Sequence, residues 1–412
     1  MADSLEVSFV LATHNRREIT LRTLEHVFGG AGPSTGFEVI VVDNTSTDGT
    51  AEAVQAAYPQ VMLLAERRNL GSCAKALGVD RASGCYIVFL DDDSYPRAGS
   101  VDRMIEHFAA DSRLGAAGFR VHLPDGGEEC SAFPNVFIGC GVGFRADALR
   151  QVGGLDLTFF MQAEEYDLSF RLINAGWRVE TFDDLHVEHL KTACARRNGR
   201  TVYYDTRNNL IVAARYLSEP YATLYRQDWL QRYAWLAAAD RRMPAFCRGV
   251  VAGSWQALRE RARYAHRRLT PAAFEALFRM EFIERRMRGL AAAGVRRVVF
   301  ADLGKNVLAF YRAAQRSAIR VTAIADDRFA ADGRYYRRIP VVALDKALGT
   351  RPEAMVVSNT SPIHAARTEH RVARRFAGSV YCWFATSTPQ GPSPADRAAT
   401  TPASEPVAAT HG

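Results

Sequence analysis

Cysteine is scarce in this 412-residue sequence, and its seven cysteines are scattered without a single C-x-x-C pair. Neither a zinc ribbon nor a disulfide framework is therefore indicated, and a reducing compartment fits best. No run of 18 apolar residues occurs, so we expect no helix that spans a membrane. The first residues lack the basic and apolar regions of a signal peptide. Together these absences predict a cytoplasmic protein.

The chain also lacks the compositional bias of fibrous or disordered proteins. Apolar residues make up 48% of it and charged residues 24%, which is typical of globular domains. The net charge of +7 is unevenly spread, since residues 191–297 hold 22 Lys and Arg against 8 Asp and Glu, a net of +14. A basic stretch of this kind predicts an anionic partner: a phosphate ligand, an acidic lipid or a nucleic acid.

The first 120 residues alternate short apolar runs with stretches of helical spacing. The apolar runs lie at 7–11, 39–42, 61–64 and 86–90. This alternation predicts an α/β domain with a mainly parallel sheet covered on both faces. Ligands of such sheets bind beyond the carboxyl ends of the strands, so the polar residues just after these runs are the first candidates for a site.

Three aspartates follow the fourth apolar run directly. Adjacent carboxylates repel each other unless a cation or hydrogen-bond donors compensate, and hard oxygen ligands suit Mg²⁺ or Mn²⁺. Because side chains alternate along extended backbone, Asp91 and Asp93 should face one way and Asp92 the other. The alternative is a solvated acidic loop.

Two further acidic positions are candidates. Asp43 follows the second apolar run and can accept hydrogen bonds from a nucleobase or ribose, although turn chemistry alone also explains it. Glu164 and Glu165 open a helix, where carboxylates either stabilise the helix start or act as a general base. Asp167 and Arg171, four residues apart, should pair on the surface of that helix.

Basic candidates follow in the next segment. His186 and His189 come after a short strand expected near Val179, and an imidazole there can complete a metal site or bind a diphosphate. The guanidinium of Arg207 can bind a phosphate through bidentate hydrogen bonds; the alternative is that Arg207 is only a charged residue at the start of a helix.

Taken together, these motifs resemble the family 2 glycosyltransferases, which have the GT-A fold. The resemblance covers about residues 5–217 and rests on six segments in the family's order. The segments are VSFVLATHNR, VIVVDNTSTDGT, RNLGSCAKALGVDRASGCYIVFLDDDSYP, GCGVGFRADALRQVGGLD, EEYDLSFRLINAGWRV and YYDTRNNLIVAARY.

The resemblance implies a role for each matching residue. It implies a Mn²⁺ or Mg²⁺ ion held by Asp93, Asp91 and His189. It implies Glu165 as the catalytic base, with Glu164 as the alternative, because the family usually has an Asp where Glu165 stands. The donor nucleotide would be bound by Thr13, Arg16, Asp43, Asn69, Asp91, Asp92 and Arg207.

We expect four regions along the chain. These are a GT-A domain (1–217), a basic helical linker (218–290), a small Rossmann-like accessory domain (291–384) and a disordered tail (385–412). In the third region only Gly304 remains of the G-x-G-x-x-G pattern, so a structural or regulatory role is favoured over NAD binding. The second region is either a solvated linker or an amphipathic surface that lies on an anionic membrane.

The expected function is an inverting, metal-dependent transfer of a sugar from a nucleoside diphosphate sugar to a hydroxyl group. The acceptor would be a surface glycan, a lipid-linked oligosaccharide or a small molecule, and no nucleic acid is expected. The protein would be cytoplasmic, with contact at the inner face of the membrane. Two alternatives stay open: a sugar nucleotidyltransferase, and an inactive regulator that binds nucleotide sugars.

Overall fold

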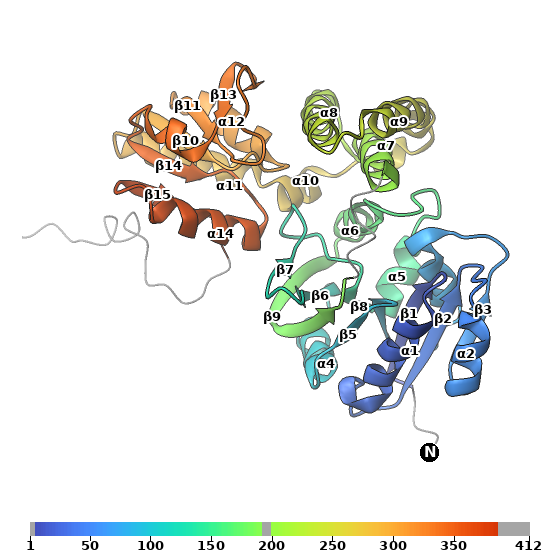
Figure 1. Cartoon of the computed structure of the whole chain (residues 1–412). Helices are drawn as coiled ribbons and strands as arrows, with labels where there is room; N and C mark the ends of the chain where they lie inside the picture. Colours follow the sequence, from blue (N-terminus) through green and yellow to red (C-terminus); the bar gives the residue numbers. More distant parts are fainter. Residues whose placement is uncertain (1–4, 192–198, 386–412) are drawn as a thin grey trace, which may run out of the picture.

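The chain folds around two separate sheets, and the helices that connect them along the sequence lie beside the smaller sheet and above the larger one in Figure 1. The computed structural model describes residues 5–191 and 199–385. All strands of the larger sheet come from residues 7–189, and all strands of the smaller one from residues 297–381. The predicted tail lies, apart from residue 385, outside the described residues.

The larger sheet has nine strands and is mainly parallel, as the sequence predicts. Its order is β3-β2-β1-β4-β8-β6-β9-β5, with β7 paired to β6. Thr13 lies opposite Asp43, and Ala12 opposite Asp91, so the carboxyl ends of three parallel strands meet at one edge. The strands are β1 (Val7–Thr13), β2 (Phe37–Asp43), β3 (Met62–Ala65), β4 (Tyr86–Asp91), β5 (Ser94–Pro96), β6 (Leu114–His122), β7 (Glu128–Glu129), β8 (Gly141–Arg145) and β9 (Arg178–His189).

Helices cover both faces of this sheet. Alternate residues of β1 point to opposite faces: Phe9 and Leu11 pack with α1, α2 and α4, whereas Val10 packs in the cluster that holds α5 and α6. Burying each such side chain contributes about 1.5–3 kcal/mol. The helices are α1 (Arg17–His26), α2 (Thr50–Ala57), α3 (Lys75–Val79), α4 (Ser100–Ala110), α5 (Ala146–Val152) and α6 (Glu164–Asn174).

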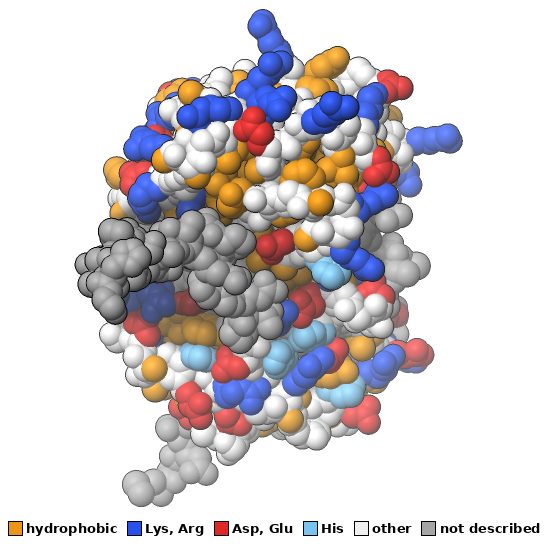
Figure 2. Space-filling view, turned by 90° about the vertical axis from the view of Figure 1, so that its left-hand side faces the viewer, with side chains coloured by type: hydrophobic (Ala, Val, Ile, Leu, Met, Phe, Trp, Pro, Cys, Tyr) orange, Lys and Arg blue, Asp and Glu red, His pale blue; other side chains and the backbone are white. Residues whose placement is uncertain are grey.

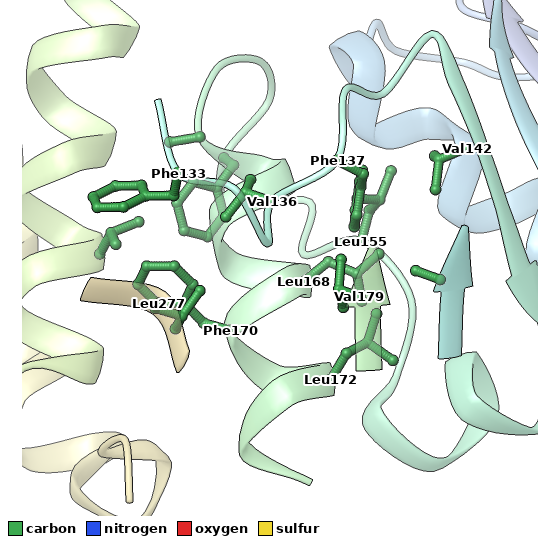
Figure 3. Packing of buried hydrophobic residues seen from close by; sticks show 14 of the residues in the cluster. Phe133, Val136, Phe137, Val142, Leu155, Leu168, Phe170, Leu172, Val179 and Leu277 are labelled. Atoms are coloured by element: carbon green, nitrogen blue, oxygen red, sulfur yellow. The ribbon is translucent and has the colours of Figure 1, made fainter. Parts of the chain in front are cut away.

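Helix α6 packs in the core beside the sheet, and Figure 3 shows how its two sides are used. Leu168 and Leu172 lie toward Val179 of β9. Phe170 lies toward Leu277, which belongs to α10 in the helical group (Figure 3). The start of α6 is therefore held firmly by apolar contacts on two sides, which fixes the position of Glu164 and Glu165.

One strand differs from its predicted extent. The sequence predicts a short strand near Val179 with His186 and His189 after it, but β9 runs from Arg178 to His189 and contains both histidines. The physical reason is alternate burial, since Leu185, Val187 and His189 all point inward. His189 is thus fixed by a strand rather than carried on a loop.

Five helices follow the larger sheet. Glycines let α9 pack closely against α7, because a Cβ on Gly249 or Gly253 of α9 would come within 2.8 Å of the backbone of α7. No helix within the described residues has the length and apolar character needed to cross a bilayer. The helices are α7 (Gly199–Tyr216), α8 (Tyr221–Ala239), α9 (Met243–Arg263), α10 (Pro271–Phe278) and α11 (Met280–Ala292).

The smaller sheet has the order β12-β13-β11-β10-β14-β15 and is parallel apart from the β12–β13 pair. Its first strand in the chain, β10, lies in the middle, as in doubly wound nucleotide-binding sheets. Its elements are β10 (Arg297–Ala301), α12 (Val307–Arg316), β11 (Arg320–Ala325), β12 (Tyr335–Tyr336), β13 (Ile339–Val342), α13 (Leu344–Leu348), β14 (Ala354–Val357), α14 (Pro362–Ala373) and β15 (Ser379–Tyr381).

Helix α8 joins the smaller sheet directly to the rest of the molecule. The Trp229 indole donates to the carbonyl of Lys305 (3.1 Å), and the Tyr225 hydroxyl donates to Asn306 Oδ1 (2.5 Å). Asp228 accepts from Arg337 at 2.7 Å. Buried contacts of this kind hold α8 against the loop that follows β10. The predicted boundaries of the four regions stay predictions.

Candidate active site

A cavity of about 370 Å³ opens at the carboxyl edge of the larger sheet. It lies where β1 and β4 end, which is the edge that the parallel topology singles out. The predicted site residues that line it are Thr13, Arg16, Asn69, Asp91, Asp92, Asp93, Glu164, Glu165 and His189. The structure therefore brings residues from five separate segments of the chain to one place.

Asp91 ends β4 and is bound by a buried lysine. Lys75 of α3 donates to Asp91 Oδ1 at 2.6 Å and to the carbonyl of Gly139 at 2.8 Å. Although burial disfavours its charge, the neighbouring carboxylate of Asp91 raises the pKa of Lys75. Asp91 Oδ2 forms no hydrogen bond within the described residues, so one oxygen is left for a ligand.

The next two aspartates share Arg16 but differ in charge. Arg16 contacts Asp92 Oδ1 at 3.2 Å and Asp93 Oδ2 at 2.7 Å. Burial raises the pKa of Asp92 to about 7, and Thr13 donates to its Oδ2. Burial also opposes ionisation of Asp93, but hydrogen bonds from His189 and Arg16 hold the pKa of Asp93 well below its usual range. Asp93 is therefore the dependable anion of the pair.

His189 connects the aspartates to a second acidic group. Its Nε2 lies 3.2 Å from Asp93 Oδ1, and its Nδ1 lies 3.0 Å from Glu129 Oε2. Despite burial, these partners and Cys140 raise the pKa of His189 to about 12. Ligand atoms of Asp91, Cys140 and His189 lie within 4.8 Å of one another, a spacing that suits a metal ion. Burial raises the pKa of Cys140, so its protonated thiol is a poor ligand for a hard cation.

Two predicted nucleotide-binding residues do not line the cavity. Asp43 is buried beside it, where Oδ2 accepts from the backbone of Ser46 and Oδ1 lacks a hydrogen-bond partner among the described residues. Arg207 on α7 donates to the carbonyl of Thr158 and to Gln256. Asp43 Oδ1 is thus buried and, within the described part of the chain, unpaired, and Arg207 holds α7 against neighbouring segments.

The two glutamates at the start of α6 have different surroundings. Glu164 accepts from Ser72 at 2.5 Å and lines only the aspartate cavity. Glu165 also lines a second, larger cavity on the other side, and it forms no hydrogen bond through its side chain within the described residues. Burial and the charge of Glu164 raise the pKa of Glu165 to about 8. Glu165 therefore lies between two cavities and is more basic than an exposed glutamate.

Asp167 is structural, but it is not on the surface. Its pairing with Arg171 is present at 2.7 Å, yet Asp167 is wholly buried. It also accepts from Arg215 at 2.9 Å and from the Tyr216 hydroxyl at 2.5 Å. The prediction of a surface pair was wrong because α6 is surrounded on both sides, so its polar side chains must be satisfied inside the protein.

The segment before α6 has strained backbone. Phe160, Gln162 and Ala163 all have positive φ angles, between 64° and 66°. Such conformations in residues other than glycine persist only where the surroundings impose them, and they cluster at functional sites. Gly71 makes the opposing loop possible: it has φ of 67°, and a Cβ there would lie 2.1 Å from the carbonyl oxygen of Phe160.

Sequence reasoning missed three residues of this site. Lys75 balances Asp91, Glu129 holds His189, and Asn44 anchors the 69–71 loop by accepting from Leu70 and donating to Gly71. Lys75 gave a signal as a single charge among the small and apolar residues of its helix, and Asn44 as a polar residue directly after an apolar run. Glu129 lies on a two-residue strand that no pattern announces.

The amino-terminal region matches a known family. Residues 8–152 match the model described as Glycosyl transferase family 2. The chain contains a family 2 glycosyltransferase domain. The match ends before α6, so the family 2 domain model includes the three aspartates but not the two glutamates or His189.

Curated relatives share the family 2 domain at modest identity. Glycosyltransferase AglE of Haloferax volcanii is 34% identical over 101 residues, which is 24% of this chain and 33% of that protein. N-acetylglucosaminyl-diphospho-decaprenol L-rhamnosyltransferase of Mycobacterium tuberculosis is 27% identical over 210 residues, 39% of this chain and 68% of that protein. The chain thus spans only a third of the first relative and about two thirds of the second.

Solved structures overlap with the fold in part. Mannosyltransferase PcManGT from Pyrobaculum calidifontis, in complex with GDP-Man and Mn²⁺, has a TM-score of 0.42 at 18% identity, over 63% of this chain and 79% of that one. GalNAc-T7 with UDP, GalNAc and Mn²⁺ has a TM-score of 0.46 at 13% identity, over 64% of this chain and 57% of that one. Scores of this size indicate a partial likeness and nothing about function.

Proposed function

We propose that this protein is an inverting, metal-dependent glycosyltransferase that moves a sugar from a nucleoside diphosphate sugar to a hydroxyl group. One observation carries the proposal. Glu165 is shared by two cavities, one lined by the three aspartates and one open toward the smaller sheet. A base in this position has the donor on one side and the acceptor on the other.

The aspartate cavity suits the donor and a divalent cation. Asp91 and Asp93 offer carboxylate oxygens that suit Mn²⁺ or Mg²⁺, and His189 would add an imidazole nitrogen once the cation displaces the proton that its acidic neighbours stabilise. Such an ion, when bound, stabilises the charge that develops on the departing diphosphate. Asp43 has a buried Oδ1 beside the cavity, unpaired among the residues that the structure describes, and a side-chain movement that exposes this atom would let it accept a hydrogen bond from the base or ribose.

The chain's own residues handle the acceptor proton. The acceptor oxygen attacks the anomeric carbon as Glu165 takes the hydroxyl proton, and the bond to the diphosphate breaks with its electron pair leaving on the diphosphate oxygen. A single displacement of this kind inverts the anomeric centre. Burial supports this role, because it makes Glu165 a stronger base than an exposed glutamate.

Two variants test the roles of the donor site and the base. Asp93→Ala should abolish both sugar transfer and metal-dependent nucleotide binding, because it removes the carboxylate that stays ionised. Glu165→Gln should keep donor binding but lower kcat by about 10²–10⁴-fold, the usual contribution of a general base. Donor binding is measured by calorimetry with Mn²⁺ and each of several nucleotide sugars, and turnover by release of nucleoside diphosphate.

Glu164→Gln is the matched control for the base. Its carboxylate is held by Ser72 and lines only the donor cavity, so its loss should affect donor binding more than the proton transfer. A full loss of kcat in Glu164→Gln with normal turnover in Glu165→Gln would move the base to Glu164. Wild-type turnover in Asp93→Ala would contradict the metal site.

We further propose contact with an anionic membrane surface through α9. Val251, Trp255 and Leu258 are 72%, 61% and 71% exposed, and at spacings of four and three residues they share one face of the helix. The exposed Arg248 and Arg259 flank them. Apolar residues beside arginines suit the boundary between headgroups and acyl chains. A lipid-linked acceptor in glycan biosynthesis, the substrate class named for the mycobacterial relative, would be reached from such a surface.

A further inference from the structure

The larger of the two cavities that share Glu165 lies between the family 2 domain and the smaller sheet. Its volume is about 690 Å³. Glu165 and Tyr166 form part of one wall, and Asp302, Lys305 and residues 359–371 form part of the opposite wall. The upper half of the face in Figure 2 is rich in basic side chains, and acidic, basic and histidine side chains mix over the lower half.

Lys305 is buried in this cavity without a charged partner. It follows β10, is 8% exposed, and its ammonium lies 4.0 Å from the centre of the Tyr166 ring and 5.0 Å from that of Trp229. It forms no hydrogen bond or ion pair through its side chain with any residue that the structure describes. Burial lowers the pKa of Lys305 to about 7, while the charges of Asp205 and Glu165 oppose this and Arg232 adds to it. An amine in this state gains its proton when an anion arrives.

Two arginines on the same side of the cavity are also without acidic partners. Within the described part of the chain, neither Arg328 nor Arg367 forms an ion pair. Both lie near His364, and burial together with the charges of these arginines lowers the pKa of His364. Arg371, by contrast, is paired with Asp327 at 3.1 Å.

The acidic residues beside them are already occupied. Asp326 accepts from the backbone of Leu303 (2.8 Å) and Arg328 (3.0 Å), and Asp302 accepts from Asn359 (2.7 Å). These hydrogen bonds are internal to the smaller domain. The positive charge on this wall is thus left for a ligand.

We propose that Lys305, Arg328 and Arg367 bind a phosphate group of the acceptor, so that its hydroxyl reaches Glu165. This inference rests on the proposed function and names its acceptor class: an alcohol that carries a phosphate or diphosphate. Arginine forks match phosphate oxygens in pairs, and lysine adds a point charge. The smaller α/β domain would therefore supply acceptor specificity.

An adjoining cavity, lined by both apolar and charged side chains, offers room for a hydrocarbon chain along its apolar part. It has a volume of about 440 Å³ and shares Glu129, Ser131 and Ile138 with the cavity that holds Lys305. Phe133 and Trp177 help to line it. The phosphate can thus belong to a prenyl lipid or to a soluble sugar phosphate, and the two sources differ in whether this second cavity is filled.

Calorimetry with the full chain in EDTA tests the proposal. The probes are inorganic phosphate, glycerol 1-phosphate and farnesyl phosphate, because metal-free buffer keeps them from binding through a cation. We expect Lys305→Met and the Arg328→Ala/Arg367→Ala double variant each to weaken binding at least tenfold, and Lys305→Arg to retain most of it. Tighter binding of farnesyl phosphate than of glycerol 1-phosphate would indicate a lipid source, and equal binding a soluble one.

Arg375→Ala is the matched control, since this exposed arginine near the end of the same helix as Arg367 pairs with Asp345 outside the cavity. It should bind the probes as the wild type does. The double variant changes only exposed side chains, so it keeps the test valid if Lys305→Met fails to fold. Absence of phosphate binding by the wild type, or binding unchanged in both variants, would overturn the inference. Mn²⁺-dependent binding of a nucleoside diphosphate, measured in parallel with Asp93→Asn, reports separately on the proposed function.

Discussion

At the scale of single residues, neighbours in the sequence acquire different chemistry. Asp92 and Asp93 are adjacent and both buried, yet the pKa of Asp92 is raised to about 7 and that of Asp93 is lowered. The difference comes from His189, which contacts Asp93. Glu164 and Glu165 are separated in the same way, because Ser72 holds the first and leaves the second exposed to two cavities. Two adjacent residues of the same type can therefore differ in protonation, because each one contacts different side chains in the folded protein.

The raised pKa of Glu165 predicts how activity depends on pH. A glutamate can act as a general base only in its carboxylate form. Because the pKa of Glu165 is raised to about 8, most of this group stays protonated at lower pH. The value of kcat/KM should therefore increase with pH up to about 8 and then level off. Initial rates from pH 4 to 9.5 with fixed Mn²⁺ measure this, and a kcat/KM that levels off already near pH 5 would contradict the raised pKa of the proposed base.

At the scale of elements, α6 depends on a buried charge network. Asp167 accepts from Arg171, Arg215 and Tyr216, and Arg215 also contacts Glu260 of α9 at 2.5 Å. This network joins three helices through one carboxylate. It fixes the direction of α6 and so the place of Glu164 and Glu165.

Removing that carboxylate should be costly. Asp167→Ala leaves Arg171 and Arg215 buried without the carboxylate that balances their charge. Removing one partner of a buried ion pair in this way lowers the free energy of unfolding by about 3–5 kcal/mol. The unfolding midpoint in urea, followed by circular dichroism, measures the change. Asp147→Ala is the control. The Asp147 side chain, which pairs with Arg150, is 82% exposed, and exposed ion pairs contribute about 0–1 kcal/mol to the free energy of unfolding. Equal effects of the two variants would contradict the network.

At the scale of the whole molecule, the smaller sheet domain completes a site that the family 2 domain begins. Lys305 approaches Tyr166 across 139 positions of sequence, and Thr360 donates to the carbonyl of Ala132 at 2.9 Å. Residues of both parts, together with residues of α7 and α8, line the larger cavity. Among the helices that connect these two parts along the sequence, α9 lies at the outer edge of the molecule (Figure 1).

The proposed membrane contact makes a prediction at this scale. Trp255→Glu combined with Leu258→Glu should reduce binding to vesicles of anionic phospholipid by at least tenfold, because it removes two exposed apolar anchors and adds like charge. Co-sedimentation with anionic and with zwitterionic vesicles measures it. Glu281→Gln on α11 is a control outside α9, and binding unaffected by the double variant would contradict the contact.

The sequence by itself determined the order of elements and the edge where the site lies. Continuous apolar runs separated by helical stretches predict a parallel sheet, and Asp91–Asp93 follow the fourth of these runs directly. The burial of Asp167 and the length of β9 escaped prediction, because both depend on which faces the later helices and strands cover.

Only the tertiary structure decided which charges remain free. Lys75 and Lys305 are both buried lysines, but the first meets Asp91 and keeps its charge, while the second lies between aromatic rings and loses much of its basicity. Nothing near either residue in the sequence distinguishes them. Electrostatic energy depends on distance and burial, and those quantities are set by contacts between segments that lie far apart along the chain.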